Sequence, residues 1–270
     1  MSKQLPFQGL WAVILGGSSG FGLAAVEKLA ASGMNVAVLF REPSATARKA
    51  VAAFTQIAAE YGVSVLPFNL NVLDAASRQA FIADFNTPDK AGKVKLLLHS
   101  VARGNLKPLV ADKETDEEQS LLSVEDIQMT TYAMSNSLLD WTRDILAAGL
   151  FHTDGRIIGL TSEGANKHWD AYAAVAIAKA SLQSLVTYMA VEFAPYGIKT
   201  NLIQAGITNT AALQKIPGSE KLVEIAQTRN PLKRMTVPQD VANVIYLLCT
   251  DEAAWINGSL IHVDGGEHCR

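Results

Sequence analysis

Tyr172 and Lys179 are the two side chains of this 270-residue chain whose types and spacing best suit acid–base chemistry. Seven helical residues advance about 700°, so both side chains would share one helix face, roughly 10 Å apart along the axis. A tyrosine with its ordinary pKa near 10 is a poor acid at neutral pH, and a nearby ammonium favours the phenolate. The pair therefore predicts a tyrosine proton donor supported by a lysine. The alternative is a core aromatic residue beside a lysine that extends to the surface.

The second candidate is a glycine-rich turn that follows the apolar segment Trp11–Leu15 and precedes a helical pattern. Its sequence is Gly16-Gly17-Ser18-Ser19-Gly20-Phe21-Gly22. Glycine permits positive φ, and the lack of a Cβ lets backbone N–H groups at a helix N-terminus approach a phosphate. The turn therefore predicts a site for the pyrophosphate of a dinucleotide. An ordinary strand-to-helix connection is the alternative.

The segments that must position these residues alternate between short apolar runs and longer helical patterns. Strands are predicted at Trp11–Leu15, Val36–Phe40, Val63–Phe68, Val94–His99, Arg156–Thr161, Lys199–Gln204 and Leu260–Val263. Helices are predicted between them, the first three over about 20–32, 44–61 and 74–86. The pattern predicts a single α/β domain over residues 1–270, with a doubly wound, seven-stranded parallel sheet of the Rossmann type.

The composition argues against several classes of protein. Hydrophobic residues make up 49% of the chain, charged residues make up 18%, and the mean hydropathy is +0.15, so disorder is not expected. The net charge of −3 and the pI of about 6.0 provide no basic surface for nucleic acid. No segment is expected to be long enough to span a bilayer, which predicts a soluble protein. The acidic stretch Asp112–Glu118 is expected to be a solvated loop or the approach to a helix start at Ser123.

The cysteines and histidines bear on metal binding and location. Cys249, Cys269 and the five histidines show no spacing typical of a metal site. Two thiols are also too few for the disulfide framework of a secreted protein. We therefore expect a cytoplasmic protein that needs no metal.

Several motifs in order resemble the short-chain dehydrogenase/reductase family over nearly the whole chain. They are the spacing of Gly16, Gly20 and Gly22, the pair Tyr172 and Lys179, and the segments Asn201–Gly206, Arg234–Ala242 and Val263–Gly266. Leu15 stands where the family usually has Thr before the first glycine. The resemblance implies an oxidoreductase that binds a nicotinamide dinucleotide and uses the tyrosine and lysine for catalysis.

Six residues lie between Tyr172 and Lys179, and this interval resembles that of the enoyl-acyl carrier protein reductase branch. Ordinary family members have three residues between the tyrosine and the lysine. Other segments depart from ordinary members in the same direction: Leu98–Ala102, Thr130–Tyr132 and Ala205–Thr208. The second aromatic residue of that branch would fall at Ser162, where carbonyl reductases have serine. The resemblance implies that Tyr172, Lys179 and Ser162 are catalytic, with Ser162 either orienting the carbonyl or filling space.

The end of the second predicted strand bears on the choice of cofactor. Arg41 would suit the 2′-phosphate of NADPH, whereas an acidic residue there, such as the neighbouring Glu42, is typical of NADH binders. We expect NADPH, with NADH as the alternative. The resemblance implies cofactor contacts from Gly16, Ser18, Ser19, Gly20, Phe21, Gly22, Arg41, Asn71, Val72, Ser100, Val101, Ala102, Lys179, Gly206, Ile207 and Thr208.

The resemblance also implies a reaction. Hydride transfer from NADPH to the β carbon of an enoyl thioester would place negative charge on the thioester oxygen, which Tyr172 would stabilise while Lys179 holds the cofactor. Acyl carrier protein or coenzyme A would carry this substrate of fatty acid biosynthesis. A carbonyl reductase or alcohol dehydrogenase of the same family is the first alternative. A catalytically silent NADP(H)-sensing protein is the second.

Two features concern the surroundings of the site. The segment 207–225 carries small and apolar residues around a Pro-Gly break and is expected to form a lid over the acyl chain. The resemblance implies a homotetramer built through the long helices around 123–148 and 172–193.

Overall fold

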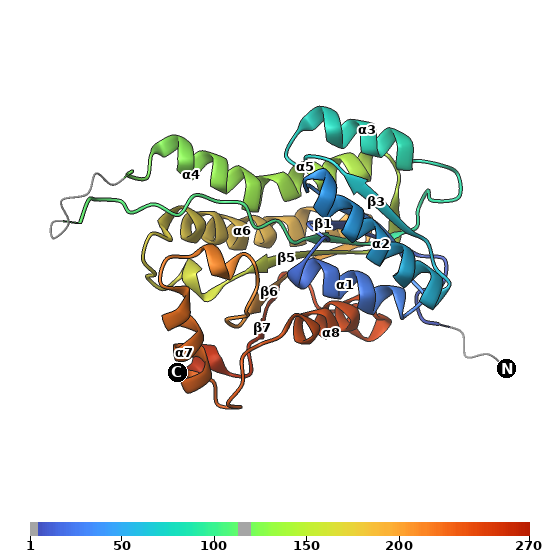
Figure 1. The fold of residues 1–270 in the computed structure, drawn as a ribbon. Coiled ribbons are helices and arrows are strands. Elements are labelled where there is room, and N and C mark those ends of the chain that lie inside the picture. The colour runs from blue at the N-terminus through green and yellow to red at the C-terminus, as the bar shows by residue number, and fades with distance from the viewer. Residues whose placement is uncertain (1–4, 113–119) are drawn as a thin grey trace.

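The core of the computed structural model, which describes residues 5–112 and 120–270, is one parallel sheet (Figure 1). Its strands are β1 (Trp11–Leu15), β2 (Asn35–Phe40), β3 (Val65–Asn69), β4 (Val94–His99), β5 (Phe151–Thr161), β6 (Ile198–Ala205) and β7 (Leu260–Val263). They pair in the order β3-β2-β1-β4-β5-β6-β7, each parallel to its neighbours. The chain builds outward from β1 to β3, then crosses to β4 and continues to β7. This reversal confirms the predicted doubly wound sheet.

Helices cover both faces of the sheet (Figure 1). One face carries α1 (Gly20–Ala30), α2 (Ser44–Tyr61) and α8 (Pro238–Cys249), and the other carries α3 (Ala75–Phe85), α5 (Ser137–Ala147) and α6 (Ala173–Glu192). α4 (Val124–Thr131) packs along α6, and α7 (Ser219–Arg229) follows β6. Strand residues alternate between the two cores, so that Ile14 packs toward α1 and Val13 toward α5.

The expected long helix around 123–148 is interrupted. α4 and α5 are joined by a π-helical turn at Tyr132–Asn136. The predicted helix start at Ser123 is confirmed by a capping box, in which Ser123 Oγ accepts from the N–H of Asp126 at 3.1 Å and the Asp126 carboxylate accepts from the N–H of Ser123 at 3.1 Å. Most of the acidic stretch Asp112–Glu118 lies outside the described residues.

Helix α6 contradicts the expectation that no segment is long enough to span a bilayer. It is 20 residues long with a mean hydropathy of 1.4, which makes it the one helix of the described residues that could cross a membrane by length and composition. Its buried side chains, such as Leu182 and Val186, pack against the sheet. The core helix of a globular domain has the same composition, and α6 occupies that position.

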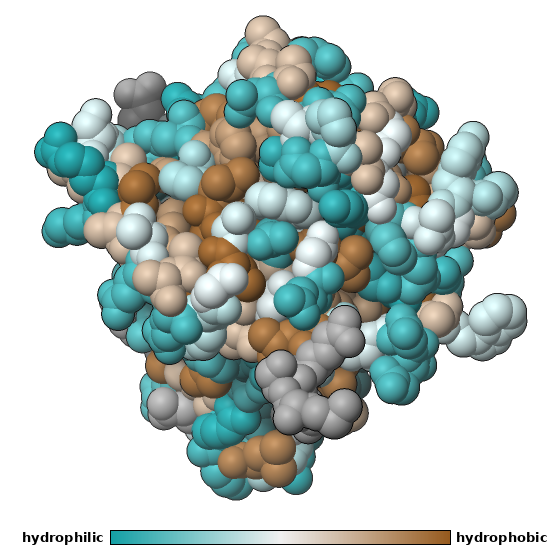
Figure 2. All heavy atoms as spheres, turned by 90° about the vertical axis from the view of Figure 1, so that its right-hand side faces the viewer, coloured by the Kyte–Doolittle hydropathy of each residue, from teal (hydrophilic) through white to brown (hydrophobic). Residues whose placement is uncertain are grey.

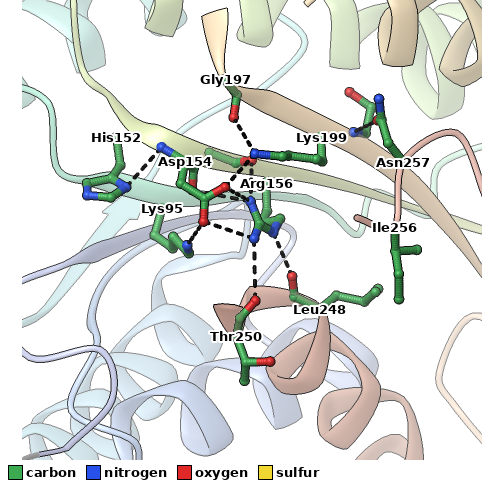
Figure 3. A network of polar contacts seen from close by, with 12 residues as sticks. Lys95, His152, Asp154, Arg156, Gly197, Lys199, Leu248, Thr250, Ile256 and Asn257 are labelled. Carbon is green, nitrogen blue, oxygen red and sulfur yellow. Dashed lines mark hydrogen bonds and ion pairs between the residues drawn. The ribbon is translucent and has the colours of Figure 1, made fainter. Parts of the chain in front are cut away.

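Strand β5 begins at Phe151, earlier than the predicted Arg156, and its first residues support a charge cluster at the amino ends of the strands (Figure 3). Asp154 accepts from Arg156 at 2.5 Å, and from Lys95 and Lys199 at 2.6 Å each. Burial alone would raise the pKa of Asp154, but these hydrogen bonds outweigh it and hold the pKa far below its ordinary value. The cluster ties the starts of β4, β5 and β6 together.

The side of the molecule away from α4 and α7 is drawn in Figure 2. Hydrophobic side chains lie there in small groups separated by hydrophilic ones. The carboxyl ends of the strands, where ligands bind in doubly wound sheets, lie at the opposite end.

Candidate active site

The glycine turn joins β1 to α1 at the carboxyl end of the sheet. Gly16 has a φ of +87°, and a Cβ on it would collide with the carbonyl oxygen of Ser100, which follows β4. Ser19 is the N-cap of α1 but makes no side-chain hydrogen bond to the first turn. The first N–H groups of α1 therefore have no side-chain cap, which leaves them able to bind an anion.

Further glycines keep the backbone around this turn closely packed. A Cβ on Gly22 would collide with the carbonyl oxygen of Gly16, and a Cβ on Gly206 would collide with neighbouring side chains. At Gly20 a Cβ would meet only Thr210, 3.7 Å away, so the space above the start of α1 is open. An uncapped helix N-terminus below open space fits the pyrophosphate of a dinucleotide.

Arg41 and Glu42 follow β2 beside this turn. The hydroxyl of Ser18 donates to Glu42 Oε1 at 3.0 Å, so the carboxylate lies against the turn. The amide of Asn69 holds the backbone of Glu42 through two hydrogen bonds of 3.0 Å each. Arg41 is exposed and forms no hydrogen bond or ion pair with any part of the chain that the structure describes. Both an acid and a free cation therefore lie next to the turn.

Tyr172, Ser162 and Lys179 line the same cleft as the glycine turn. The Tyr172 hydroxyl and Ser162 Oγ are 3.2 Å apart, and either can donate. Lys179 Nζ donates to the carbonyl oxygen of Leu160 at 2.7 Å, which fixes the lysine under the end of β5. The structure thus brings all three predicted catalytic side chains to one wall.

Burial changes the acidity of these groups. It raises the pKa of Tyr172 above the ordinary 10.0, and the hydrogen bond with Ser162 only partly opposes this shift. Burial also lowers the pKa of Lys179 to about 8. The expectation that Lys179 would favour a Tyr172 phenolate is therefore wrong in this arrangement. At neutral pH Tyr172 is a phenol that can donate a hydrogen bond, and Lys179 is still mostly an ammonium.

Tyr172 lies one residue before α6, not within it as predicted. Ala171 has a φ of +56°, a rare conformation for a residue with a Cβ. The N–H of Tyr172 donates to the carbonyl of Trp169 at 3.2 Å and closes a turn before the helix. The turn carries the Tyr172 ring into a buried cluster with Met134 and Val175, while Lys179 extends from the first half of α6.

Most of the predicted cofactor contacts line the same cleft, which has a volume of about 260 Å³. They are Gly16, Ser19, Gly20, Phe21, Ser100, Val101, Ala102, Lys179, Gly206, Ile207 and Thr208. Ser18 and Gly22 belong to the turn without lining the cleft, and Arg41 lies beside it.

Asn71 and Val72 are not part of the cleft lining. Asn71 Oδ1 accepts from the N–H of Leu73 at 3.3 Å, and the carbonyl of Val72 accepts from Trp141 Nε1 at 2.8 Å. Both residues therefore stabilise the turn after β3. Their contact with the adenine stays a prediction.

The cleft also contains residues that were not predicted. Thr210 lies opposite Gly20, and extending the segment Ala205–Thr208 by two residues would have found it. Trp169 packs on Tyr172, with ring centroids 4.9 Å apart. Its position three residues before Tyr172 was the only sequence signal.

An ion-pair network around Arg229 was also missed, because its members are far apart in the sequence. Arg229, at the end of α7, pairs with Glu163 and, at 2.9 Å, with Glu267. Glu163 also pairs with Lys167, and Glu267 Oε1 accepts from the N–H of Ile207 at 3.4 Å. Burial raises the pKa of Glu267. Burial would do the same for Glu163, but hydrogen bonds from its two cations leave its pKa below the ordinary value. The network joins α7 to two loops that line the cleft.

The segment predicted as a lid lies beside the cleft. Ile207, Leu213 and Ile216 line it, and they pack with Ala226 of α7. The side chains of residues 220–222 and 225 are outside the described set. The described part of the segment 207–225 therefore presents apolar side chains to the cleft, and its role as a lid stays a prediction.

No group of three or more His, Cys, Asp or Glu side chains within residues 5–112 and 120–270 is placed to hold a metal ion. Cys249 is a buried free thiol and Cys269 an exposed one.

The fold and the site define a nicotinamide-dependent oxidoreductase of the short-chain dehydrogenase/reductase class. Residues 16–268 match the family described as enoyl-(acyl carrier protein) reductase, and the chain belongs to this family. The family match spans the glycine turn, the segment from Ser162 to Lys179, and most of the closing segment after β7.

Individual relatives carry different activities in their names. The chain is 31% identical over 196 residues to the NADH-dependent enoyl-[acyl-carrier-protein] reductase FabI of Enterococcus faecalis, covering 72% of this chain and 75% of that protein. It is 28% identical over 266 residues to the 3-oxoacyl-[acyl-carrier-protein] reductase FabG of Escherichia coli, covering 96% and 98%. The crystal structure of the enoyl-[acyl-carrier-protein] reductase (NADH) of Aquifex aeolicus superposes with a TM-score of 0.81 at 25% identity, covering 98% of both chains.

Proposed function

We propose that the chain reduces the carbon–carbon double bond of an enoyl thioester with NADPH, as in fatty acid biosynthesis. The observation that carries this proposal is the Tyr172 hydroxyl, which is buried in a largely apolar cleft and protonated at neutral pH, with six residues between Tyr172 and the buried Lys179. The family match and the FabI relative of Enterococcus faecalis support the same assignment. Acyl carrier protein or coenzyme A would carry the acyl group.

The side chains of the cleft have distinct roles in this reaction. Bound NADPH would supply the hydride for the β carbon. The Tyr172 hydroxyl donates a hydrogen bond to the thioester oxygen, on which negative charge develops. Lys179 provides a fixed positive charge and a donor for the cofactor ribose. Water then protonates the α carbon and completes the reduction.

Reduction of a ketone is the second candidate, and one observation favours it. Ser162 Oγ lies 3.2 Å from the Tyr172 hydroxyl, so both could bind one carbonyl oxygen. The FabG relative reduces 3-oxoacyl groups by its name. For a ketone Tyr172 would have to give up its proton, and the raised pKa makes that harder.

Parallel assays with crotonyl and acetoacetyl thioesters separate these candidates. NADPH oxidation with the crotonyl thioester is expected. Turnover of the acetoacetyl thioester alone would establish the ketone reductase. Tight NADPH binding without turnover of either compound would indicate the catalytically silent sensor.

The choice of NADPH rests on the free guanidinium of Arg41, and the contact between Ser18 and Glu42 is the observation that favours NADH. Arg41→Ala should lower the ratio of kcat/KM for NADPH to that for NADH by at least about tenfold, because a charge-assisted hydrogen bond contributes about 1.5–3 kcal/mol. Glu42→Gln is the matched variant and should raise the ratio. An unchanged ratio in Arg41→Ala would contradict the assignment.

The lid and the assembly are part of the proposal. The apolar underside formed by Leu213 and Ile216 supports closure of the segment 207–225 over an acyl chain. Exposed apolar side chains on α4 and α6 support a homotetramer through these helices: Val124, Met129, Ile177, Tyr188 and Val191. Sedimentation at equilibrium would test the assembly, since a monomer at micromolar concentration would contradict it.

A further inference from the structure

Trp169 packs against Tyr172, the proposed catalytic tyrosine. Its half-buried ring lies 4.9 Å from that of Tyr172, with the planes tilted by 53°. Gly164 makes this contact possible, because a Cβ there would lie 2.6 Å from the Tyr172 ring and 3.4 Å from the Trp169 ring. The loop between β5 and α6 is thus packed so that Trp169 has a defined position relative to the reacting end of the cleft.

Trp169 separates two cavities. The inner cleft of about 260 Å³ contains Tyr172 and Lys179. An outer cavity of about 980 Å³ lies on the other side of Trp169, Tyr172 and Leu106, which line both. Many side chains of the outer cavity are apolar: Leu106, Leu109, Val110, Ala173, Ala176 and Pro217. An apolar cavity that a single wall of side chains separates from the inner cleft suits the hydrocarbon chain of an acyl group.

Trp169 also contacts the lid. It packs against the buried cluster that contains Tyr172 and also against the buried cluster of Ile207, Leu213 and Ala226. A substrate that lies between Tyr172 and the lid segment must therefore pass along the Trp169 ring. The Trp169 ring therefore lies where it would contact the acyl carbons beyond the double bond of the substrate.

We propose that Trp169 determines specificity by closing the inner cleft against the outer cavity, so that the enzyme prefers short acyl groups. This inference rests on the proposed function, since it takes the ligand to be an acyl thioester. Each methylene that moves from water into an apolar cavity improves binding about fourfold, so four additional methylenes could contribute at most about two hundredfold.

The test is the acyl-length profile of kcat/KM with enoyl-coenzyme A substrates of four and eight carbons. The wild-type protein should prefer the four-carbon substrate. Trp169→Ala and Trp169→Leu should raise the eight-to-four ratio by at least about tenfold, and Trp169→Phe should leave it near the wild-type value. Trp255→Ala is the control, because Trp255 is 98% exposed and lies outside both cavities.

A purely structural role would lower the rate on both substrates equally and leave their ratio unchanged, and that result would overturn the proposal. Calorimetric binding of saturated butyryl- and octanoyl-coenzyme A to the NADPH-loaded protein gives a second readout that needs no turnover. If the wild type reduces no enoyl thioester but Trp169→Ala still gains affinity for the octanoyl compound, the proposed reaction fails and the role of Trp169 stands. If crotonyl-coenzyme A is reduced and neither readout changes with chain length in Trp169→Ala, the role of Trp169 fails alone.

Discussion

Replacing Tyr172 with Phe removes one hydroxyl from the cleft and leaves the ring in place. The hydroxyl is the donor proposed for the thioester oxygen, and its only hydrogen bond among the described residues is the 3.2 Å contact with Ser162. Loss of one preorganised donor to a developing oxyanion lowers kcat about 10²- to 10³-fold, or about 3–4 kcal/mol of barrier. The lost contact with Ser162 should reduce the free energy of unfolding by only about 1 kcal/mol.

The assay for Tyr172→Phe combines kcat from NADPH oxidation with the dissociation constant for NADPH. The Tyr172 hydroxyl is proposed to bind the thioester oxygen, whereas the glycine turn is proposed to bind the pyrophosphate, so NADPH binding should be unchanged while kcat falls. Ser162→Ala should have a smaller effect with the crotonyl thioester. Equal losses of binding and turnover in Tyr172→Phe would refute the reasoning, because they would show that the residue is structural.

Three further results are expected. Burial lowers the pKa of Lys179 to about 8, so kcat/KM should decline as the ammonium is lost above that pH, and a flat profile to pH 10 would contradict its role. Asp154→Asn should lower the free energy of unfolding by about 3 kcal/mol in urea at neutral pH, since it leaves buried cations unpaired. The pKa of Asp154 is depressed in the folded state, so the stability that Asp154 contributes is complete above the unfolded pKa of 3.8 and disappears as the pH falls through the folded pKa. If Asp154→Asn were still less stable than the wild type in strong acid, that result would argue against this origin. Arg229→Gln should raise KM for the thioester about tenfold by releasing α7, whereas Arg234→Gln, whose exposed ion pair lies outside the cleft, should leave KM unchanged.

The sheet could be predicted because parallel strands buried on both faces are apolar without interruption, as in Trp11–Leu15. The start of β5 could not be predicted, because His152 and Asp154 interrupt the apolar pattern. Asp154 is polar for a tertiary reason, since it binds cations from β4, β5 and β6.

The glycine turn and the presence of Tyr172 and Lys179 in one cleft followed from local spacing and from the order of the motifs. The turn that precedes α6 could not be predicted from the sequence, because nothing in the residue type of Ala171 indicates a positive φ. The Arg229 network joins positions 38 and 66 residues apart, so no local pattern could reveal it. Burial also reversed the expected shift in the pKa of Tyr172, which depends on packing that sequence does not show.

Deuterium transfer in a competition assay tests the central claim most directly. The wild-type protein would receive crotonyl and acetoacetyl thioesters together with NADPH deuterated at the transferable position, and the products would be identified by mass spectrometry. The account predicts a butyryl thioester that carries deuterium on the β carbon. Deuterated 3-hydroxybutyryl thioester without any butyryl product would contradict it.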